Sequence, residues 1–239
     1  MRQKMMVLMA VTLACLIAAP VLGADDPNKP ANPEVTKLVE KLTADVNRLA
    51  PPLPDDLTDD DRARLTKEFG MLRTLVKTRL IPVCTNKVLV QEVAGQNAKQ
   101  VALEEIQKID TQWKDAEDEL PIQAEKMSNN CAKEIIRIAK TLPVLGETFV
   151  MDNQGANVGQ NALTSDYWQG DEAKWKNSFK EGKGGVDISK RQFDKSTNIV
   201  DQKVSLPIID EQGKVIGAVC FGIKVESLKD VAVASAGSN

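Results

Sequence analysis

The stretch KVSLPIIDEQGKVIGAVCFGIKV, residues 203–225, has the clearest strand–loop–strand pattern in the sequence. Its first third alternates polar and apolar side chains and then becomes wholly apolar, as a β-strand does. The polar, glycine-containing segment DEQGK follows and has the composition of a hairpin loop. A second apolar run comes directly after it. The pattern therefore predicts two antiparallel strands, at 202–209 and 215–225, joined by a short loop.

Side-chain alternation in the first of these strands separates its two faces. Lys203 and Ser205 are expected on one face, and Val204 and Leu206 on the other. Alternation alone leaves open which of the two faces would line a pocket.

Three further strands are expected upstream of this hairpin. Strand-like clusters at 147–151 and 156–160 flank an Asp-Asn-Gln-Gly turn signal, and a third cluster lies at 186–192. Residues 165–179, between the second and third clusters, have a helical pattern rich in polar and aromatic side chains. The order of these elements favours a mostly antiparallel sheet of five strands.

Residues 34–142 show no strand pattern, and their apolar side chains recur mainly at helical spacing. Apolar side chains recur at helical spacing through 34–49 and 58–80. Pro82 then either kinks the second helix or starts a new one, because proline has no backbone N–H to donate. Helical patterns continue as far as residue 142. The fold class predicted is α+β, with long N-terminal helices packed on the five-stranded antiparallel sheet.

The N-terminus is typical of a secretory signal peptide, residues 1–23. Two basic residues precede an apolar stretch at 5–21, and small residues follow around Gly23 and Ala24. One alternative is an uncleaved membrane anchor, although the apolar run is at the short limit of what spans a bilayer. Another is a lipoprotein cleaved at Cys15. The favoured hypothesis is cleavage, which would make the protein periplasmic or secreted.

The rest of the chain is expected to have three parts. Residues 24–57 form a leader with a short helix and a linker, residues 58–228 form a single domain, and residues 229–239 form a frayed tail. No later segment is apolar for long enough to cross a membrane, so no membrane insertion is expected after cleavage.

Composition excludes several classes of function. The sequence contains no histidine, which removes Ser-His-Asp and Cys-His nucleophile systems and histidine-ligated metals or haem. The net charge of −3 becomes more negative once the basic leader is removed, so nucleic acid is not an expected partner. Residues 59–61, three consecutive Asp, are better explained by capping of a helix than by a metal. We therefore expect no enzyme, no metal and no cofactor.

Three cysteines lie beyond the signal peptide: Cys84, Cys131 and Cys220. In an oxidising compartment an odd number predicts one pair and one spare thiol. Cys84 and Cys131 lie in helical patterns that would run antiparallel, so a disulfide between them is the hypothesis, with Cys220 as a buried thiol in a strand. The alternative is three unpaired, buried thiols.

Three segments together resemble a known family. They are FVMDNQG at 149–155, DYWQGDE at 166–172, and VSLPIID at 204–210 continued by GKVIGA. The first and last resemble the opening and closing hairpins of Cache domains, the extracytoplasmic PAS-like sensors of chemoreceptors and histidine kinases. The middle segment looks like the one that caps the ligand pocket. The resemblance covers roughly residues 80–228 and implies a PAS-like sheet that binds a small molecule.

The second segment supplies most of the candidate ligand-binding residues. Tyr167 is the only tyrosine of the chain, and Trp168 and Trp175 are two of its three tryptophans. If this segment is a helix, Trp168 and Trp175 share a face, with Asp171 close by. Aromatic walls with a carboxylate among them suit a small organic ligand, an amine-bearing one in particular. The alternative is that the aromatic rings only plug the face of the sheet.

Two more candidates lie near the third and fourth strands. The resemblance implies that Asp194 holds a ligand amine, with a solvated turn residue as the alternative. Ser205 would line the pocket if its face is the one turned to the ligand.

These patterns favour a sensor module that binds a small molecule and acts through a partner, such as a membrane receptor or kinase. The second hypothesis is a ligand-free module whose long helices form a homodimer or dock on a receptor. A third is a redox-responsive protein that uses the unpaired cysteine.

Overall fold

The computed structural model describes residues 32–51, 53, 57–194 and 199–229, so the expected signal peptide lies outside the described residues. Seven α-helices and six strands follow one another along the chain. They are α1 (Pro33–Arg48), α2 (Asp59–Leu75), α3 (Lys87–Asn97), α4 (Leu103–Asp115), α5 (Pro121–Ser128), α6 (Asn130–Thr141), β1 (Leu145–Met151), β2 (Asn157–Gln160), α7 (Ala173–Phe179), β3 (Asp187–Ile188), β4 (Gln192–Asp194), β5 (Ile199–Ile209) and β6 (Val215–Lys224).

The strands form one antiparallel sheet in the order β2-β1-β6-β5-β3, and β4 also pairs with β5. The predicted fold class, helices packed on an antiparallel sheet, is confirmed. The strand expected at 186–192 is divided into β3 and β4, and both occupy the same edge of β5. Five positions across the sheet are therefore filled, as predicted.

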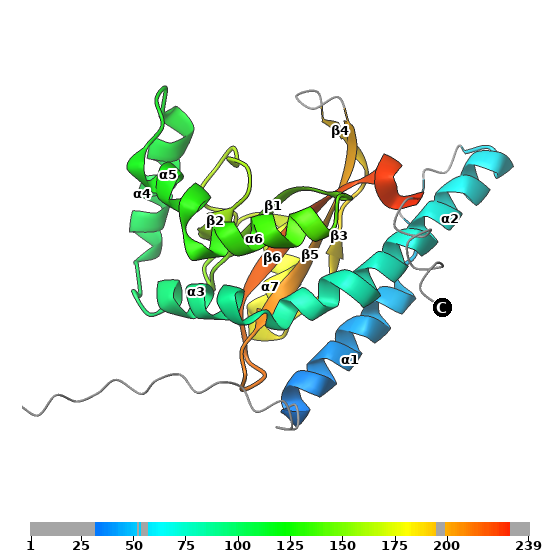
Figure 1. Cartoon of the computed structure of the whole chain (residues 1–239), viewed down its shortest axis with the longest axis horizontal. Coiled ribbons are helices and arrows are strands. Elements are labelled where there is room, and N and C mark those ends of the chain that lie inside the picture. Colours follow the sequence, from blue (N-terminus) through cyan, green and yellow to red (C-terminus); the bar gives the residue numbers. More distant parts are fainter. Residues whose placement is uncertain (1–31, 52, 54–56, 195–198, 230–239) are drawn as a thin grey trace, which may run out of the picture. The chain divides into compact units, whose positions relative to one another are not determined.

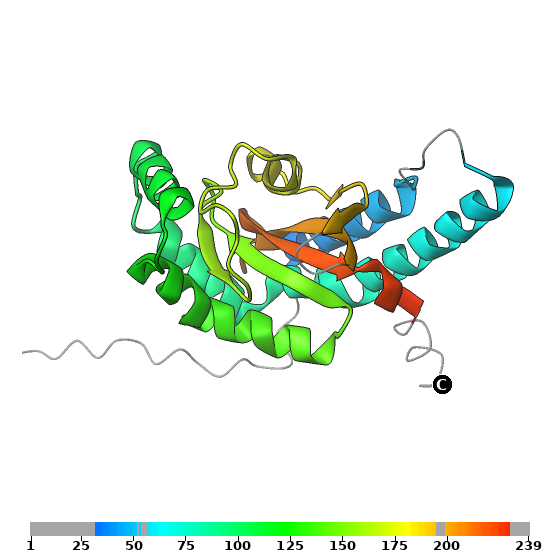
Figure 2. The same ribbon diagram turned by 90° about the horizontal axis from the view of Figure 1, so that it is seen from above.

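Helices lie on both sides of the sheet. Figure 2 shows α7, in olive, on one side and α6, in bright green, on the other. Helices α3 and α6 pack side by side on that second side, where Asn86 and Asn130 bond to Glu134 and Glu92 respectively. Their face of the sheet is apolar. Its buried side chains include Val150, Val204, Leu206, Ile208, Val219, Phe221 and Ile223.

Helices α2 and α3 follow one another with little change of direction (Figure 1). A π-helical turn, Val76–Leu80, and a 3₁₀ turn, Ile81–Thr85, connect them. Pro82 lies in the 3₁₀ turn and Asn86 caps α3, accepting from Leu89 N at 3.2 Å. Pro82 therefore precedes a new helix, which was one of the two outcomes predicted.

Helix α1 belongs to the same core as the sheet. Leu42 and Val46 are completely buried within it, and Asn32 at its start donates to Glu211 O in the β5–β6 loop. At the other end of the helical layer, α6 closely approaches β2 at Gly159. A Cβ at this glycine would lie 2.6 Å from Cys131 Cβ, so only glycine allows the contact. None of the helices in the described part of the chain is long and apolar enough to span a membrane.

Candidate functional site

The face of the sheet under α7 carries a row of four directly opposed residues. They are, in order, Gln160 of β2, Phe149 of β1, Cys220 of β6 and Ser205 of β5. Opposed residues of neighbouring strands project to the same side of a sheet, so these side chains form one line. With strands about 4.8 Å apart, the line is roughly 14 Å long. All four side chains are buried.

Two flanking rows complete this face. One consists of Asn157, Met151, Ala218 and Pro207. On the other side, Lys203 and Glu147 form an ion pair across Gly222, with Nζ and Oε2 3.1 Å apart. The face therefore has an apolar centre and polar ends, whereas the face under α3 and α6 is mainly apolar, with Thr148 and Gln202 as its buried polar residues on the sheet.

Trp175 of α7 covers the apolar centre. It packs on the cluster formed by Phe149, Met151, Ala218 and Cys220. Its indole Nε1 donates to Asp152 O at 3.0 Å, and its ring stacks on Phe179 with centroids 4.9 Å apart. The cover is thus attached to the β1–β2 turn by one hydrogen bond.

Lys174 brings a positive charge under the same helix. Its Nζ lies 5.4 Å from the centroid of the Phe149 ring, a cation–π contact. The ammonium also pairs with Glu172 at 2.9 Å and donates to Gln169 Oε1 at 2.8 Å. Since its side chain is only 15% exposed, this charge is held close to the polar end of the row.

The polar end itself is a network of buried side chains. Asn157 Nδ2 donates to Gln160 Oε1 at 3.1 Å and to Thr164 Oγ1 at 2.8 Å, and Thr164 Oγ1 donates to Gln160 Oε1 at 2.9 Å. These bonds use only one end of each amide. Asn157 Oδ1, Gln160 Nε2 and Ser205 Oγ are buried without a partner of good hydrogen-bond geometry among the described residues, although the Ser205 hydroxyl lies against the Cys220 thiol. Leaving such a group unpaired costs about 1–3 kcal/mol.

Cys220 lies in the row but is not a nucleophile. Burial raises the pKa of its thiol to about 11, so it is protonated at neutral pH. Within the described residues, no group of three or more Cys, Asp or Glu side chains is placed to hold a metal ion.

Two of the residues singled out from the sequence, Trp175 and Ser205, lie on this face. Ser205 shows which side of β5 is turned to α7, a question that alternation left open. That they bind a ligand remains a prediction.

Tyr167 and Trp168 lie in an extended segment instead of a helix, so the helix expected over 165–179 is wrong for its first half. Trp168 bridges to Ala156 beside β2, and α7 begins only at Ala173. Asp110 of α4 accepts both backbone N–H groups, of Tyr167 and Trp168, at 2.9 Å. These long-range bonds outweigh the local helical preference. Trp168 and Trp175 therefore do not share a helical face.

The rings of both residues face α4 and the β1–β2 turn. Tyr167 packs on Trp113 with centroids 5.6 Å apart, and burial raises the pKa of its phenol well above the ordinary value. Trp168 Nε1 donates to Gln154 O at 2.8 Å. In this structure the two rings fix the loop in place beside the row.

The two acidic candidates lie away from the row. Asp171 is exposed at the surface before α7. Asp194 is the last residue of β4, opposite Ile199, which is roughly 20 Å along β5 from Ser205. The structure therefore does not bring these two positions together with Trp175 and Ser205.

The disulfide expected between Cys84 and Cys131 is absent, because both residues are buried free thiols, as is Cys220. The register of α3 and α6 explains this. Asn130 contacts Glu92, so Cys131 lies beside the body of α3, whereas Cys84 lies in the 3₁₀ turn before α3 begins. Burial also raises the pKa of both thiols, which makes them unreactive and argues against a redox switch.

Sequence reasoning missed Asn157, Gln160 and Lys174. A register shift between Val150 and Met151 places Asn157 and Gln160 on the same face, although simple alternation would separate them. The available signal was chemical: two amides in a strand that is otherwise fully buried.

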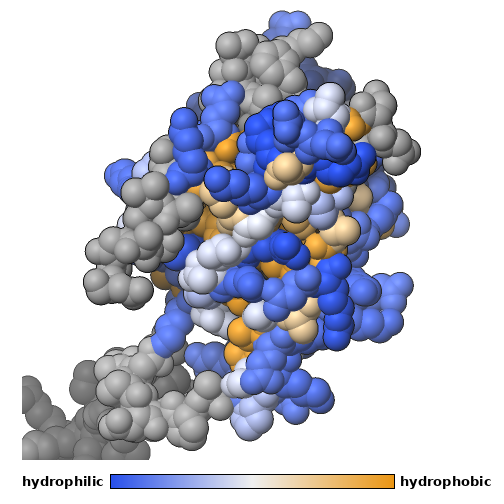
Figure 3. All heavy atoms as spheres, turned by 90° about the vertical axis from the view of Figure 1, so that its right-hand side faces the viewer, coloured by the Kyte–Doolittle hydropathy of each residue, from blue (hydrophilic) through white to orange (hydrophobic). Residues whose placement is uncertain are grey.

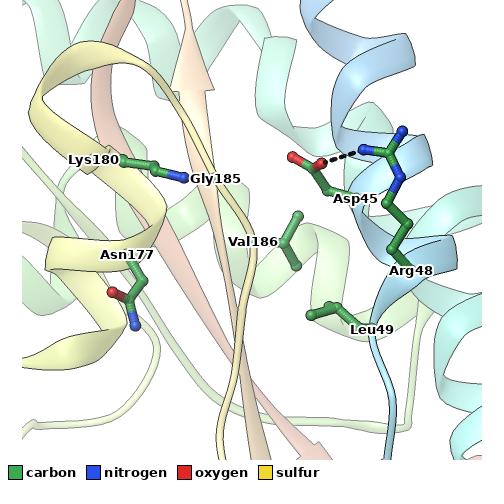
Figure 4. A pocket seen from close by; sticks show the side chains of 7 residues that line it. All are labelled: Asp45, Arg48, Leu49, Asn177, Lys180, Gly185 and Val186. Carbon is green, nitrogen blue, oxygen red and sulfur yellow. Dashed lines mark ion pairs between the residues drawn. The ribbon is translucent and has the colours of Figure 1, made fainter.

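A separate hollow of about 340 Å³ lies between the end of α1 and residues 177–186 (Figure 4). Its lining includes Asp45 and Arg48, which pair with each other at 3.6 Å. Figure 4 shows Leu49 and Val186 on the wall between these charges and the α7 side. No residue predicted to bind a ligand contributes to it.

Comparisons with known proteins give only distant structural similarity. No family model matches the sequence, and no curated protein matches it. The sensor domain of the Vibrio cholerae histidine kinase DctB is 14% identical, with a TM-score of 0.37, and the match covers 72% of this chain and 57% of that one. The match to the Campylobacter jejuni chemoreceptor Tlp3 domain with 4-methylisoleucine covers 87% and 66%, at 12% identity and a TM-score of 0.36.

A third match is the ligand-binding domain of the Pseudomonas aeruginosa amino-acid chemoreceptor PctC in complex with GABA. It is 12% identical, has a TM-score of 0.32, and covers 60% of this chain and 59% of that one. The three matches are a sensor domain of a histidine kinase and ligand-binding domains of two chemoreceptors. This chain spans about three fifths of their length.

Proposed function

We propose that this protein is a sensor module that binds a small polar molecule between α7 and the row Gln160–Phe149–Cys220–Ser205. One observation carries the proposal. Three side-chain atoms, Asn157 Oδ1, Gln160 Nε2 and Ser205 Oγ, are buried on this face without a hydrogen-bond partner. Buried polar groups are nearly always paired in stable proteins, so unpaired groups on one face point to an absent partner.

The unpaired atoms define what the ligand must offer. Asn157 Oδ1 requires an N–H or O–H donor, Gln160 Nε2 requires an acceptor, and Ser205 Oγ accepts either. A small organic molecule with a nitrogen donor at one end and an oxygen acceptor near it meets these needs, in agreement with the amine-bearing ligand expected from the sequence. Trp175 and the Phe149 ring supply the apolar walls. Tyr167 and Trp168 are proposed to act only at the rim of the site, and no role in it is proposed for Asp171 and Asp194, whose positions lie away from the row.

Entry of a ligand requires α7 to move. Trp175 now occupies the apolar centre, and its hydrogen bond to Asp152 O attaches the cover to the β1–β2 turn. A ligand that binds the displaced arrangement better than the present one shifts the population toward it. Because Gln96 and Asn97 at the end of α3 bond to the same turn, the displacement reaches the long helices.

The output passes to a partner. The N-terminal sequence has the pattern of a signal peptide, so we propose that the protein acts in the periplasm or outside the cell, where a membrane receptor or kinase would read the long helices. A homodimer through these helices is part of the same proposal.

Native mass spectrometry of protein purified from the periplasm tests the proposal, followed by thermal-shift screening with amines, amino acids, carboxylates and purines. A bound small molecule, or a stabilising compound whose effect is lost in Ser205→Ala, supports it. Thr141→Ala, which removes a methyl group and a hydroxyl bonded to Ile138 O on α6, away from this face, is the control and should bind normally. An empty protein that no compound stabilises contradicts the proposal.

The second candidate function is a ligand-free interaction module. It is favoured by the closure of the face, because Trp175 and Phe149 already fill its centre. Against it, only Leu103 and Leu163 are strongly exposed large apolar residues in the described part of the chain. On the side of α1 and α2, Figure 3 shows apolar atoms in separate patches between hydrophilic ones. Light scattering over a range of concentrations, together with the thermal-shift screen, distinguishes the two, since the interaction module should associate while no small molecule stabilises it.

A further inference from the structure

A second hollow lies on the opposite side of the sheet from α7. It has a volume of about 240 Å³ and is formed by α3, α5, the start of α6 and Val158 of β2. Val158 belongs to the face that packs on the helices, and Asn129 Nδ2 donates to its carbonyl at 2.7 Å. This hollow therefore shares no side chain with the row under α7.

A buried lysine forms part of the wall of this hollow. The side chain of Lys126 is only 6% exposed, and burying an ammonium group costs several kcal/mol unless it is well paired. Two acceptors among the described residues reach its Nζ: Gln96 Oε1 at 2.8 Å and Glu125 Oε2 at 2.9 Å. An ammonium has three N–H donors. One donor is therefore left for an acceptor that enters the hollow.

The other charged residues of the lining are of both signs. Lys99 lies two residues beyond the end of α3 at Asn97, and Glu92 lies on that helix seven residues before Lys99. Glu92 accepts only from the neutral amide of Asn130, at 3.1 Å, among the bonds found. Glu125 already receives bonds from Lys126 and Asn129. Positive and negative groups with unused capacity thus lie at different points of one small cavity.

A glycine in the last turn of α3, Gly95, keeps this cavity open. A Cβ at Gly95 would meet no heavy atom within 4 Å, so no contact inside the protein requires glycine there. Glycine inside a helix costs about 0.5–1 kcal/mol relative to alanine. Glycine at this position leaves space in the hollow but lowers the stability of α3.

We propose that this hollow is a second binding site, distinct from the α7-covered face, for a small zwitterion that carries a carboxylate and an ammonium group. The carboxylate accepts the third N–H of Lys126 and meets Lys99, and the ammonium group meets Glu92. A simple anion would lie beside Glu92 and Glu125 without compensation, and a simple cation would leave Lys126 unsatisfied. The larger hollow beside α1 lacks this arrangement, because Asp45 and Arg48 there pair with each other.

Gln96 connects the two sites. Its Oε1 accepts from Lys126, and its Nε2 donates to Asp152 Oδ2 at 2.9 Å. Asp152 O in turn accepts from the Trp175 indole of the α7 cover. Occupation of the hollow therefore acts on the residue that holds the cover in place.

An NMR titration of the mature protein with glycine, the smallest such zwitterion, tests the proposal. The backbone amides of Gly95, Lys99 and Asn129 should shift in a saturable manner. Acetate and methylammonium, which carry only one of the two groups, should bind with an affinity at least about tenfold lower than that of glycine. A response to acetate equal to that of glycine would overturn the zwitterion assignment.

Three variants make the test specific. Lys126→Met removes the ammonium but keeps a side chain of similar length, and Gly95→Leu fills the hollow from a helix that gains stability. Both should abolish the shifts. Gly70→Leu is the matched control, because Gly70 also lies inside a helix with open space around it but does not line the hollow. The site is refuted if the shifts are absent in the parent protein, or if they persist in both Lys126→Met and Gly95→Leu. Ser205→Ala should leave them unchanged, which separates this site from the α7-covered one.

Discussion

The two faces of the sheet differ in chemistry although both are buried. The face under α3 and α6 carries Val204, Leu206, Val219 and Phe221 at its centre, and its buried polar residues, Thr148 and Gln202, lie toward one end. The face under α7 carries Gln160, Ser205 and the Lys203–Glu147 pair around a small apolar centre. The first face has the composition of a core that stabilises the fold. The second face lowers the stability of the fold, because it buries polar groups that have no hydrogen-bond partner among the described residues.

The largest expected effect compares two phenylalanines on adjacent strands. Phe221 and Phe149 are each 1% exposed, the first under the helices and the second under α7. Phe221→Ala should lower the free energy of unfolding by about 3–5 kcal/mol. Phe149→Ala should lower it by less, because a single short helix can settle into the space. Urea denaturation of both variants measures the difference, and equal losses would contradict the contrast between the faces.

Much of this contrast could be predicted from the sequence. The alternation in residues 203–209 separated Lys203 and Ser205 from Val204 and Leu206, and the structure confirms that division. It could not show that Gln160 lies in line with Ser205, because register depends on pairing through two intermediate strands. Nor could local periodicity show that Asp110, 57 residues before Tyr167, holds the segment around that residue extended. Contacts between distant parts of the chain decided both.

The next effect separates a partnered hydroxyl from an unpartnered one. Thr164→Val should lower the free energy of unfolding by about 2 kcal/mol, because Asn157 and Gln160 lose a buried partner. Ser205→Ala removes a hydroxyl that has no partner, so stability should stay the same or rise by up to about 1 kcal/mol. Thermal denaturation without added ligand measures the stability change of both variants. A loss with Ser205→Ala as large as with Thr164→Val would mean that Ser205 is paired after all.

The smallest effect concerns pH on the helix side. Hydrogen bonds from Arg137 hold the pKa of Glu134 below its ordinary value, with a further bond from Asn86. The native carboxyl therefore binds a proton less readily than the unfolded one, so its contribution is present above the unfolded pKa, near 4.3. It is lost as the pH falls through the folded pKa.

Glu134→Gln should consequently cost about 0.5–1 kcal/mol at pH 7 and almost nothing at pH 3. Denaturation of parent and variant at both pH values gives the difference. A cost that does not change with pH would show that the carboxylate charge is not what stabilises the contact between α3 and α6.

In the proposed function, α7 opens as a cover, whereas α3 and α6 stay packed on the other face of the sheet. Hydrogen–deuterium exchange followed by mass spectrometry measures both regions in one sample. We expect the amides of residues 173–179 in α7 to exchange faster than those of residues 87–97 in α3. A ligand found by the screen should slow exchange in α7 specifically. Exchange of α7 at the same rate as α3, unaffected by any ligand, would contradict the proposed function.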